Sequence, residues 1–252
     1  MHAAGTSRQA GAPAVRTAVV WDVLRAALAD RVTVTGRDRL DIVDAGGGTG
    51  GFAVPLAALG HAVTVVDPSP DSLAALERRA AEAGVAVRAL QGDAADLGDL
   101  LPPGATDLVL CHSVLEYVED PGGALAAMAR LLRADGMLSV LAANPLAAAL
   151  HRSVAGRFDE AREVLGDPEG RWGDRDPTPR RFTRQELVSL LGAAGLRPGE
   201  IHGVRVFADL VPSRFLDGEP GAAAALVALE QAAAEHPVLR DIAAQLHVLG
   251  RR

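Results

Sequence analysis

Residues 42–51 read IVDAGGGTGG, an apolar run that ends at Asp44 and Ala45 and then passes into a segment made almost entirely of glycine. A short apolar, β-branched run is typical of a buried strand, so we expect a strand over residues 41–45. Glycine has no Cβ, so the run lets the chain turn sharply and brings bare backbone N–H groups close to a ligand. The sequence therefore predicts a strand, a ligand-binding turn and a helix that begins at about Phe52.

The same alternation of strand and helix continues after the glycine run. Further apolar, β-rich runs occur at residues 62–67, 85–90, 106–111 and 137–143. Helical patterns separate them, most clearly at 70–84, which stops at Gly84, and at 121–136, which stops at Gly136. Strands that alternate with helices form a parallel sheet through right-handed crossovers, with helices on both faces. The predicted fold class is therefore α/β.

Additional segments flank this core on both sides. The spacing of Val15, Val19, Val20 and Leu24 predicts a helix ahead of the sheet. Residues 144–181 are a long segment rich in turn-forming residues, which we interpret as a functional lid.

The remainder of the chain carries a few more elements. Thr183 and Glu186 have the spacing of a capping box for a helix that closes at Gly195. Then follow a strand at 201–210, an alanine-rich helix at 219–236 and a last strand at 243–252. We expect one domain over residues 1–252, composed of an N-terminal helical cap (1–39), a core (40–143), the lid (144–181), and the C-terminal part of the sheet with a helical insertion (182–252).

Composition excludes several classes of protein. The chain has 252 residues, of which 49% are hydrophobic, which excludes a disordered protein. Its net charge of -7 argues against broad, nonspecific binding of nucleic acid. Cys111 is the only cysteine, which excludes an intrachain disulfide and a thiolate zinc cluster. The histidines lack metal-binding spacing, no run is long enough to span a membrane and residues 1–16 lack a compact apolar leader. We therefore expect no metal, no membrane segment and a cytoplasmic location.

Two cofactors fit the glycine run. Gly46, Gly48 and Gly51 satisfy the G-x-G-x-x-G fingerprint of dinucleotide-binding proteins. Gly46, Gly48 and Gly50 satisfy the G-x-G-x-G that follows an acidic residue in methyltransferases that use S-adenosylmethionine (SAM). Asp67, about 20 residues further on, suits ribose hydroxyls in both cases. The spacing alone leaves both cofactors open.

The surrounding sequence favours SAM. Asp93 ends the third strand, where methyltransferases place a residue near the adenine ring, and CHSVLEYVEDP (111–121) resembles the segment that follows their fourth strand. LLRADGMLSV (131–140) resembles their helix, tight turn and fifth strand. There is no second βαβαβ half that would hold a nicotinamide.

These segments together resemble class I SAM-dependent methyltransferases, which implies a Rossmann-like, seven-stranded and mostly parallel sheet. VRTAVVWDVLRAAL, VDAGGGTG, CHSVLEYV, SVAGRFDEA, GVRVFADL and LHVLGRR further resemble, in order and spacing, the bacterial tRNA 5-carboxymethoxyuridine methyltransferase family. That resemblance implies a tRNA partner and methyl esterification of the carboxylate of a modified wobble uridine.

The resemblance also implies roles for individual residues. Arg16 would meet the SAM carboxylate, Gly46 and Gly47 its amino-acid moiety, and Asp67 its ribose. The adenine would lie against Ala94 and Ala95, and His112 would lie near the methyl group. The full set of expected cofactor-binding residues is Arg16, Asp44, Gly46, Gly47, Gly48, Gly50, Asp67, Asp93, Ala94, Ala95 and His112.

The acceptor decides whether a base is needed. A carboxylate is already ionised near neutral pH, whereas a hydroxyl must lose a proton, and His112 is the first candidate base in that case. Tyr117 either lines the acceptor pocket or packs, and Arg157 either binds the acceptor or pairs with Asp159 or Asp174 on the surface.

Arg205 lies in a strand-like segment, GVRVF. Strand alternation would put Arg205 and Phe207 on one face, with Val204 and Val206 on the other. Arg205 is then either an outward-facing arginine or a clamp for an anionic acceptor. Two other functions stay open: a small-molecule O- or N-methyltransferase of the same fold, which the acidic charge favours, and a non-catalytic SAM-binding scaffold.

Overall fold

The computed structural model describes residues 12–167, 176–218 and 220–252. Its centre is a seven-stranded sheet in the order β3-β2-β1-β4-β5-β7-β6. The strands are β1 (Asp41–Ala45), β2 (Ala62–Asp67), β3 (Arg88–Gln91), β4 (Thr106–His112), β5 (Leu132–Ala143), β6 (Arg197–Val204) and β7 (Gln245–Arg251). Strands β1 to β5 are parallel, whereas β7 pairs antiparallel with both β5 and β6. The predicted α/β class with a seven-stranded, mostly parallel sheet is confirmed.

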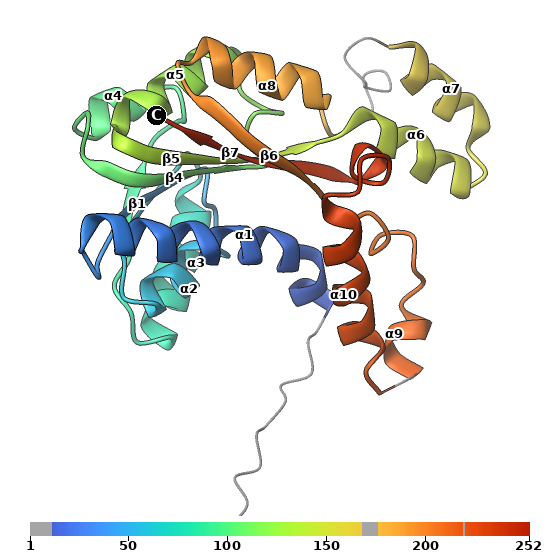
Figure 1. The fold of residues 1–252 in the computed structure, drawn as a ribbon, viewed down its shortest axis with the longest axis horizontal. Helices are drawn as coiled ribbons and strands as arrows, with labels where there is room; N and C mark the ends of the chain where they lie inside the picture. Colours follow the sequence, from blue (N-terminus) through green and yellow to red (C-terminus); the bar gives the residue numbers. More distant parts are fainter. Residues whose placement is uncertain (1–11, 168–175, 219) are drawn as a thin grey trace, which may run out of the picture.

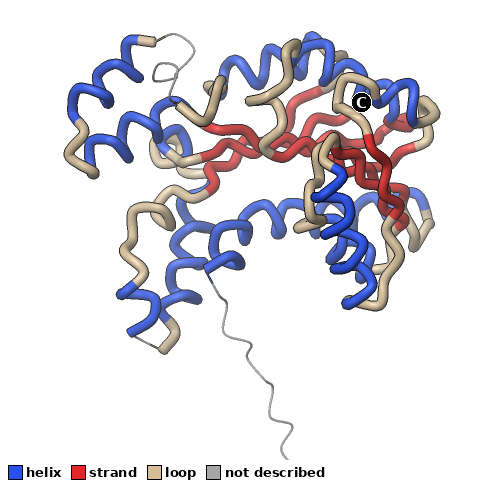
Figure 2. Tube along the Cα trace, turned by 180° about the vertical axis from the view of Figure 1, so that it is seen from behind, coloured by secondary structure: helices blue, strands red, loops and turns tan. Residues whose placement is uncertain are grey.

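Helices cover both faces of the sheet (Figures 1 and 2). One face carries α1 (Ala12–Thr35), α2 (Ala53–Ala58) and α3 (Pro70–Glu82), and the other carries α4 (Leu97–Leu100), α5 (Pro121–Leu131) and α8 (Arg184–Ala193). Strand alternation builds a core on each face: Leu108 and Leu110 pack toward α1, whereas Val109 and Cys111 pack toward α5. Within the described ranges, no helix is long and apolar enough to cross a membrane.

Helix ends follow the sequence signals closely. Ser69 caps α3 by accepting a hydrogen bond from the Ser72 amide at 3.2 Å. The predicted capping box of α8 is present, because the Thr183 amide donates to Glu186 at 2.7 Å and the Glu186 amide donates back to the Thr183 hydroxyl at 3.3 Å. Both Gly84 and Gly195 have positive φ just past their helices, so both act as helix stops.

Several boundaries differ from the prediction, among them the start of β5, at Leu132 rather than 137, and the start of β6, at Arg197 rather than 201. β3 begins at Arg88 rather than at 85, because Val85 still belongs to the helix end, where its amide donates to Ala80 O at 3.0 Å. α5 ends at Leu131 rather than at Gly136, and Asp135, not the glycine, takes the positive φ of 57°. Gly136 is required for another reason: a Cβ there would lie 2.9 Å from Arg133 O.

The predicted strand at 201–210 is wrong in its second half. β6 ends at Val204, and Arg205 has a φ of 60°, which leaves the strand region. The cause is a carboxylate from another element. Glu230, which is 1% exposed on α10 (Ala222–Ala234), accepts hydrogen bonds from the next three backbone amides. The expected alternation of Arg205 and Phe207 against Val204 and Val206 therefore does not apply.

The C-terminal helices lie at one end of the sheet. α9 (Arg214–Gly218) and α10 follow β6, and a short 3-10 turn, Arg240–Ile242, leads into β7. α10 packs against α1 (Figure 1), so the first and last helices of the described chain are neighbours. Of the helix expected at 219–236, residues 222–234 are helical, and residue 219 lies outside the described residues.

The segment 144–181, called the insertion below, is more regular than predicted. It contains α6 (Pro145–Val154) and α7 (Phe158–Gly166), which pack through Ala148, Ala149 and Val164. Residues 168–175 of the insertion lie outside the described residues. Both of its ends meet the sheet at Ala143, whose amide donates to Glu116 at 2.7 Å and whose carbonyl accepts from the Phe182 amide at 2.8 Å.

An ion cluster ties the opposite, amino-terminal edge of the sheet together. Asp107, 0% exposed, accepts hydrogen bonds from the Asp41 amide at 2.9 Å and from Arg31, Arg37 and Arg133 at 3.2, 2.9 and 2.7 Å. Burial alone would raise its pKa, but the Asp41 amide and the charges of Arg133 and Arg37 outweigh burial and lower the pKa. This cluster lies at the strand starts, away from the strand ends where ligands bind in such sheets, so we interpret it as structural.

Candidate functional site

The candidate site lies where β1 and β4 end side by side. β1 pairs with β2 on one side and with β4 on the other, so the chain leaves these two strands in opposite directions. In open α/β sheets, such a switch point opens a crevice at the carboxyl ends of the strands. Asp44 is the penultimate residue of β1, and Asp67 and His112 are the last residues of β2 and β4.

The glycine turn distinguishes the two motifs that spacing left open. Gly46, Gly48 and Gly50 have φ values of 69°, 53° and 80°. A Cβ at Gly46 would lie 2.4 Å from Val114 Cγ2, and one at Gly50 would lie 2.3 Å from Leu76 Cδ1. Gly51, by contrast, has no such φ and no neighbour within 4 Å. The positions that require glycine are therefore those of G-x-G-x-G, not those of G-x-G-x-x-G.

Asp67 holds the turn in place. Its carboxylate accepts hydrogen bonds from the Gly48 amide at 2.8 Å and from the Ser69 amide at 3.0 Å. The Gly46 amide donates to Val66 O at 2.7 Å, which continues the link to β2. Each carboxylate oxygen carries a second lone pair, so Asp67 retains the capacity to accept from a ligand hydroxyl.

Asp44 is a buried carboxyl beside the same turn. It is 3% exposed, and a Cβ on Gly47 would lie 2.6 Å from its Cγ, so only glycine leaves it room. Burial, and then the negative charge of Asp67, raise the pKa of Asp44 to about 7. Two neighbouring carboxyls of this kind favour a cationic ligand, because a positive charge relieves both effects.

The residues expected near an adenine follow β3. The Asp93 carboxylate accepts from the Ala95 amide at 3.1 Å, which closes a tight turn. Asp93 and Ala95 are exposed, whereas Ala94 is buried and packs in the core on the α5 face.

His112 begins a row of polar side chains that crosses the sheet. Its Nε2 lies 2.8 Å from Ser139 Oγ, which lies 2.8 Å from His247 Nε2, and the His202 ring follows with its centroid 6.0 Å from that of His247. These side chains share the α1 face, because their strand neighbours Leu138, Val140, Leu246 and Val248 pack in the opposite core. The sequence signal for this row was a serine and a histidine inside otherwise apolar strands, and it was missed.

Burial lowers the pKa of His112 to about 3. The ring also packs edge-on against Phe52, with a centroid distance of 4.6 Å. An imidazole with so low a pKa is neutral at physiological pH and is a weak base.

Two of the three arginines considered as ligand-binding residues, Arg16 and Arg205, meet on one carboxylate that sequence reasoning missed. Arg16, near the start of α1, lies 3.0 Å from Asp209 Oδ1, and Arg205 Nε lies 3.3 Å from Asp209 Oδ2. β6 runs in the same direction as β5, because both pair antiparallel with β7. Arg205 therefore lies at the same edge of the sheet as His112. An acidic residue four positions after an arginine was the available signal.

Tyr117 and Arg157 are both exposed. The Tyr117 residue is 64% exposed, which leaves it available to a ligand and excludes simple core packing. Arg157 donates to Glu160 at 2.8 Å on the surface of the insertion. Asp174, one of the two aspartates considered from the sequence, lies outside the described residues.

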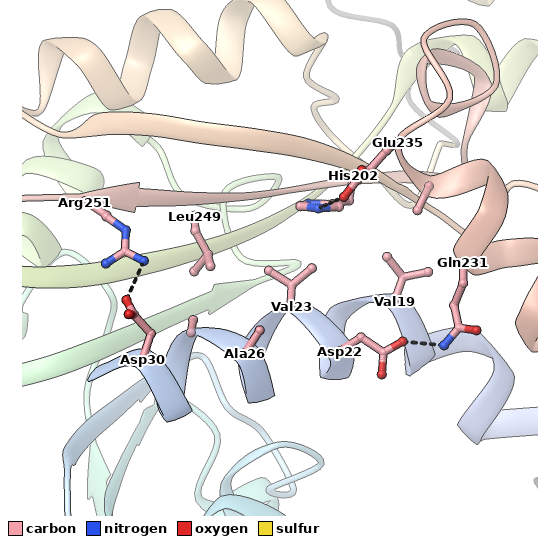
Figure 3. Close-up of a pocket in the computed structure, with 12 residues that line it drawn as sticks. Val19, Asp22, Val23, Ala26, Asp30, His202, Gln231, Glu235, Leu249 and Arg251 are labelled. Carbon is pink, nitrogen blue, oxygen red and sulfur yellow. Dashed lines mark hydrogen bonds and ion pairs between the residues drawn. The ribbon is translucent and has the colours of Figure 1, made fainter. Parts of the chain in front are cut away.

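A separate cavity of about 560 Å³ lies between α1, β6, β7 and α10 (Figure 3). Its apolar lining includes Val19 and Val23 of α1 and, opposite them, Leu249 of β7. Three polar pairs cross it: Arg251 with Asp30 at 3.2 Å, Gln231 with Asp22 at 2.5 Å, and His202 with Glu235 at 3.2 Å. None of the residues that line it belongs to the glycine turn, so it is distinct from the candidate site.

Comparison with known proteins identifies the family. A family model described as a methyltransferase domain matches residues 43–140. The chain is 32% identical over 197 residues to the tRNA 5-carboxymethoxyuridine methyltransferase of Escherichia coli, a match that covers 77% of this chain and 72% of that one. It is 31% identical over 192 residues to a ubiquinone biosynthesis O-methyltransferase of Azorhizobium caulinodans, covering 72% of each chain.

Solved structures show the same fold. A magnesium protoporphyrin IX methyltransferase from Synechocystis with bound S-adenosylhomocysteine (SAH) superposes with a TM-score of 0.59 at 17% identity, over 98% of this chain and 90% of that one. A possible histamine N-methyltransferase from Thermotoga maritima gives a TM-score of 0.56 at 19% identity, over 96% and 99%. With the G-x-G-x-G turn, the family match and the identity to the curated relatives in agreement, this chain belongs to the SAM-dependent methyltransferases.

Proposed function

We propose that this methyltransferase esterifies the carboxylate of 5-carboxymethoxyuridine at the wobble position of tRNA. The observation that carries the proposal is the state of His112. His112 ends β4, and the family resemblance implies that it would lie near the methyl group; its pKa of about 3 leaves it unable to serve as an effective base. A carboxylate acceptor needs no base, because it is already ionised at neutral pH. The identity to the Escherichia coli enzyme supports the same acceptor.

The residues of the turn fit SAM. Gly46 and Gly50 let the turn lie against Val114 and Leu76, where Cβ atoms would clash, and the Asp67 carboxylate has lone pairs left for ribose hydroxyls. Asp44 would hold the ammonium group, and Arg16 would hold the carboxylate. When bound, SAM supplies an electrophilic methyl group on a sulfonium.

The chain's remaining task is to place the acceptor. Displacement at the methyl group requires the attacking oxygen about 3 Å away and opposite sulfur, so orientation contributes most of the catalysis. Arg205 would bind the acceptor carboxylate, and Tyr117, exposed beside the end of β4, would contact the rest of the acceptor. The Asp93–Ala95 turn would receive the adenine through the exposed Ala95 and the edge of Asp93.

The acceptor is tested with total tRNA from a strain that lacks the enzyme. Incubation with labelled SAM and nucleoside mass spectrometry should show the methyl ester of 5-carboxymethoxyuridine and no other labelled nucleoside. A label that appears only when a metabolite extract replaces the tRNA would favour the small-molecule alternative. That alternative is supported by the identity to the ubiquinone biosynthesis O-methyltransferase and by the net charge of -7.

We expect kcat at saturating SAM to be constant between about pH 6 and 9, because His112 stays neutral and a carboxylate acceptor stays ionised over this range. The measurement is a pH profile with single-turnover controls to isolate the methyl-transfer step. A kcat that rises through a pKa near 7 would indicate a working base and would contradict a carboxylate acceptor.

We also expect SAH to bind more tightly as the pH rises from about 6 to 8, because an ammonium favours ionised Asp44, whose pKa is about 7 in the free protein. Below that pKa, Asp44 must lose its proton on binding, so affinity rises with pH and then levels off above it. Calorimetry in buffers of different ionisation enthalpy would detect the released proton. The Asp44→Asn variant should bind SAH more weakly and lose this pH dependence; if the variant keeps it, another group is responsible.

A further inference from the structure

One carboxylate joins two arginines that come from opposite ends of the chain. Asp209 Oδ1 lies 3.0 Å from the Arg16 guanidinium, and Asp209 Oδ2 lies 3.3 Å from Arg205 Nε. The Arg16 side chain is 53% exposed, whereas those of Arg205 and Asp209 are 26% and 17% exposed. The aspartate therefore provides an ordered position that a long, exposed arginine side chain would not keep alone.

The backbone under Asp209 is held in place. Arg205 has a φ of 60°, a strained conformation for a residue with a side chain. Its carbonyl accepts from the Ala244 amide at 3.2 Å, and the next three amides donate to Glu230 at 2.7–2.8 Å. Strain of this kind persists only where the surroundings over-determine the backbone, so the loop that carries Asp209 is preorganised.

Both arginines keep capacity for a further anion. Asp209 Oδ1 and Arg205 Nε are buried, yet neither forms a hydrogen bond of good geometry within the described residues. The two ion pairs are therefore contacts between charges, and N–H groups of both guanidinium groups remain available to a ligand. The charges of this cluster also shift the pKa of His151 on α6. Burial, then the charges of Arg205 and Arg152, lower its pKa, while Asp209 acts in the opposite direction. The ion pairs thus join α1 with the loop after β6, and their charges act on the insertion through His151.

We propose that Asp209 is a positioning residue that holds Arg16 and Arg205 together, so that one guanidinium faces the cofactor carboxylate and the other faces the acceptor carboxylate. The acceptor half of this inference rests on the proposed function, and the cofactor half does not. Two guanidinium groups around one carboxylate keep a net positive charge for ligands. Without the carboxylate the two cations repel each other and the exposed Arg16 side chain regains its rotamer freedom.

The test is the Asp209→Asn variant, which preserves size and removes the charge. Binding is measured by calorimetry with two probes: SAH, which carries the amino-acid carboxylate, and 5′-methylthioadenosine, which lacks it. We expect the Kd for SAH to rise about tenfold, about 1.4 kcal/mol. The Kd for methylthioadenosine should stay unchanged. Asp209→Glu, which restores the charge on a longer side chain, should recover part of the loss.

The matched control is Asp30→Asn, which removes the other ion pair of α1, between Asp30 and Arg251 at 3.2 Å. It should leave the affinity for both probes unchanged. Unchanged or tighter SAH binding in Asp209→Asn would overturn the proposal, since Asp209 would then be a bystander or a competitor for the arginines. An equal loss for both probes would also overturn it, because it would indicate a general disturbance of the site.

The effect of Asp209 on acceptor binding is measured by steady-state kinetics with tRNA. With tRNA that carries 5-carboxymethoxyuridine, Asp209→Asn should raise KM about tenfold and leave kcat within about twofold. A fall in kcat with unchanged KM would overturn the acceptor half of the inference. If the wild-type enzyme methylates no such tRNA, the proposed function fails, and the contrast between SAH and methylthioadenosine still decides the role of Asp209.

Discussion

Replacing Gly46 with alanine should weaken SAH binding by at least about 100-fold and lower kcat/KM for SAM at least as much. Two costs add at this position. A φ of 69° costs about 1–2 kcal/mol for a residue with a Cβ, and that Cβ would lie 2.4 Å from Val114 Cγ2. Val114 follows Ser113, whose φ is 56°, so the backbone that carries Val114 is itself constrained. Moving the Val114 side chain away from the new Cβ would therefore cost further free energy. Calorimetry with SAH and initial rates with varied SAM measure the effect.

Two glycines provide controls for Gly46. Gly51 lies in the same turn, but it has an ordinary φ and open space around its missing Cβ, so Gly51→Ala should bind SAH almost as the wild type does. Gly60, between α2 and β2, has a φ of 96° and open space, so Gly60→Ala should lower stability without changing affinity. If Gly51→Ala is as damaging as Gly46→Ala, the turn is of the G-x-G-x-x-G type and the assignment of the motif is wrong.

Replacing Glu230 with alanine should lower the free energy of unfolding by about 3 kcal/mol or more. Its buried carboxylate accepts from the amides of Val206, Phe207 and Ala208 at 2.8, 2.8 and 2.7 Å. Hydrogen bonds to a charged acceptor contribute about 1.5–3 kcal/mol each when their loss leaves a buried donor unpaired. The loop that carries Asp209 would also lose its anchor, so SAH affinity should fall with stability.

Urea denaturation at constant m-value measures the stability loss. Glu230→Gln keeps the size and one accepting oxygen, so it should lose about half as much. Glu235→Ala is the control from the end of the same helix: its side chain is 71% exposed in a pair with His202, and its loss should be below about 1 kcal/mol. A change in Glu230→Ala no larger than that in Glu235→Ala would show that solvent replaces the carboxylate at the three amides.

Local patterns in the sequence predicted the framework well. The runs at 41–45, 62–67 and 106–111 correspond closely to β1, β2 and β4, because a strand buried on both faces is apolar throughout. The capping box of Thr183 and the stops at Gly84 and Gly195 depend only on residues a few positions apart. Such short-range signals are sufficient wherever no distant side chain competes for the backbone.

Where side chains distant in the sequence determine the backbone or the site, local sequence patterns could not predict the structure. The end of β6 is set by Glu230, which follows Arg205 by 25 positions in the chain, so alternation in GVRVF predicted a strand that the structure ends early. The row from His112 to His247 is assembled from three strands that are adjacent only after folding. Spacing could not separate the two glycine motifs either, because the difference lies in which glycines have positive φ.

The helical content of the insertion was underestimated for a different reason. Turn-forming residues in its second half suggested an irregular segment, whereas its first half, rich in alanine and leucine, forms α6 and α7. Helix propensity there outweighs the average composition of the whole segment.

The anchoring of the insertion at Ala143 makes the register of the sheet independent of the sequence of the insertion. Ala143 accepts from Phe182 where the insertion returns, so the chain leaves and rejoins the sheet at neighbouring positions. Closing a loop of greater length costs little extra entropy, and the strand register does not depend on what the loop contains. We therefore expect that shortening or replacing this segment would leave the strand ends that form the crevice in register, so that the cofactor site tolerates changes in the insertion.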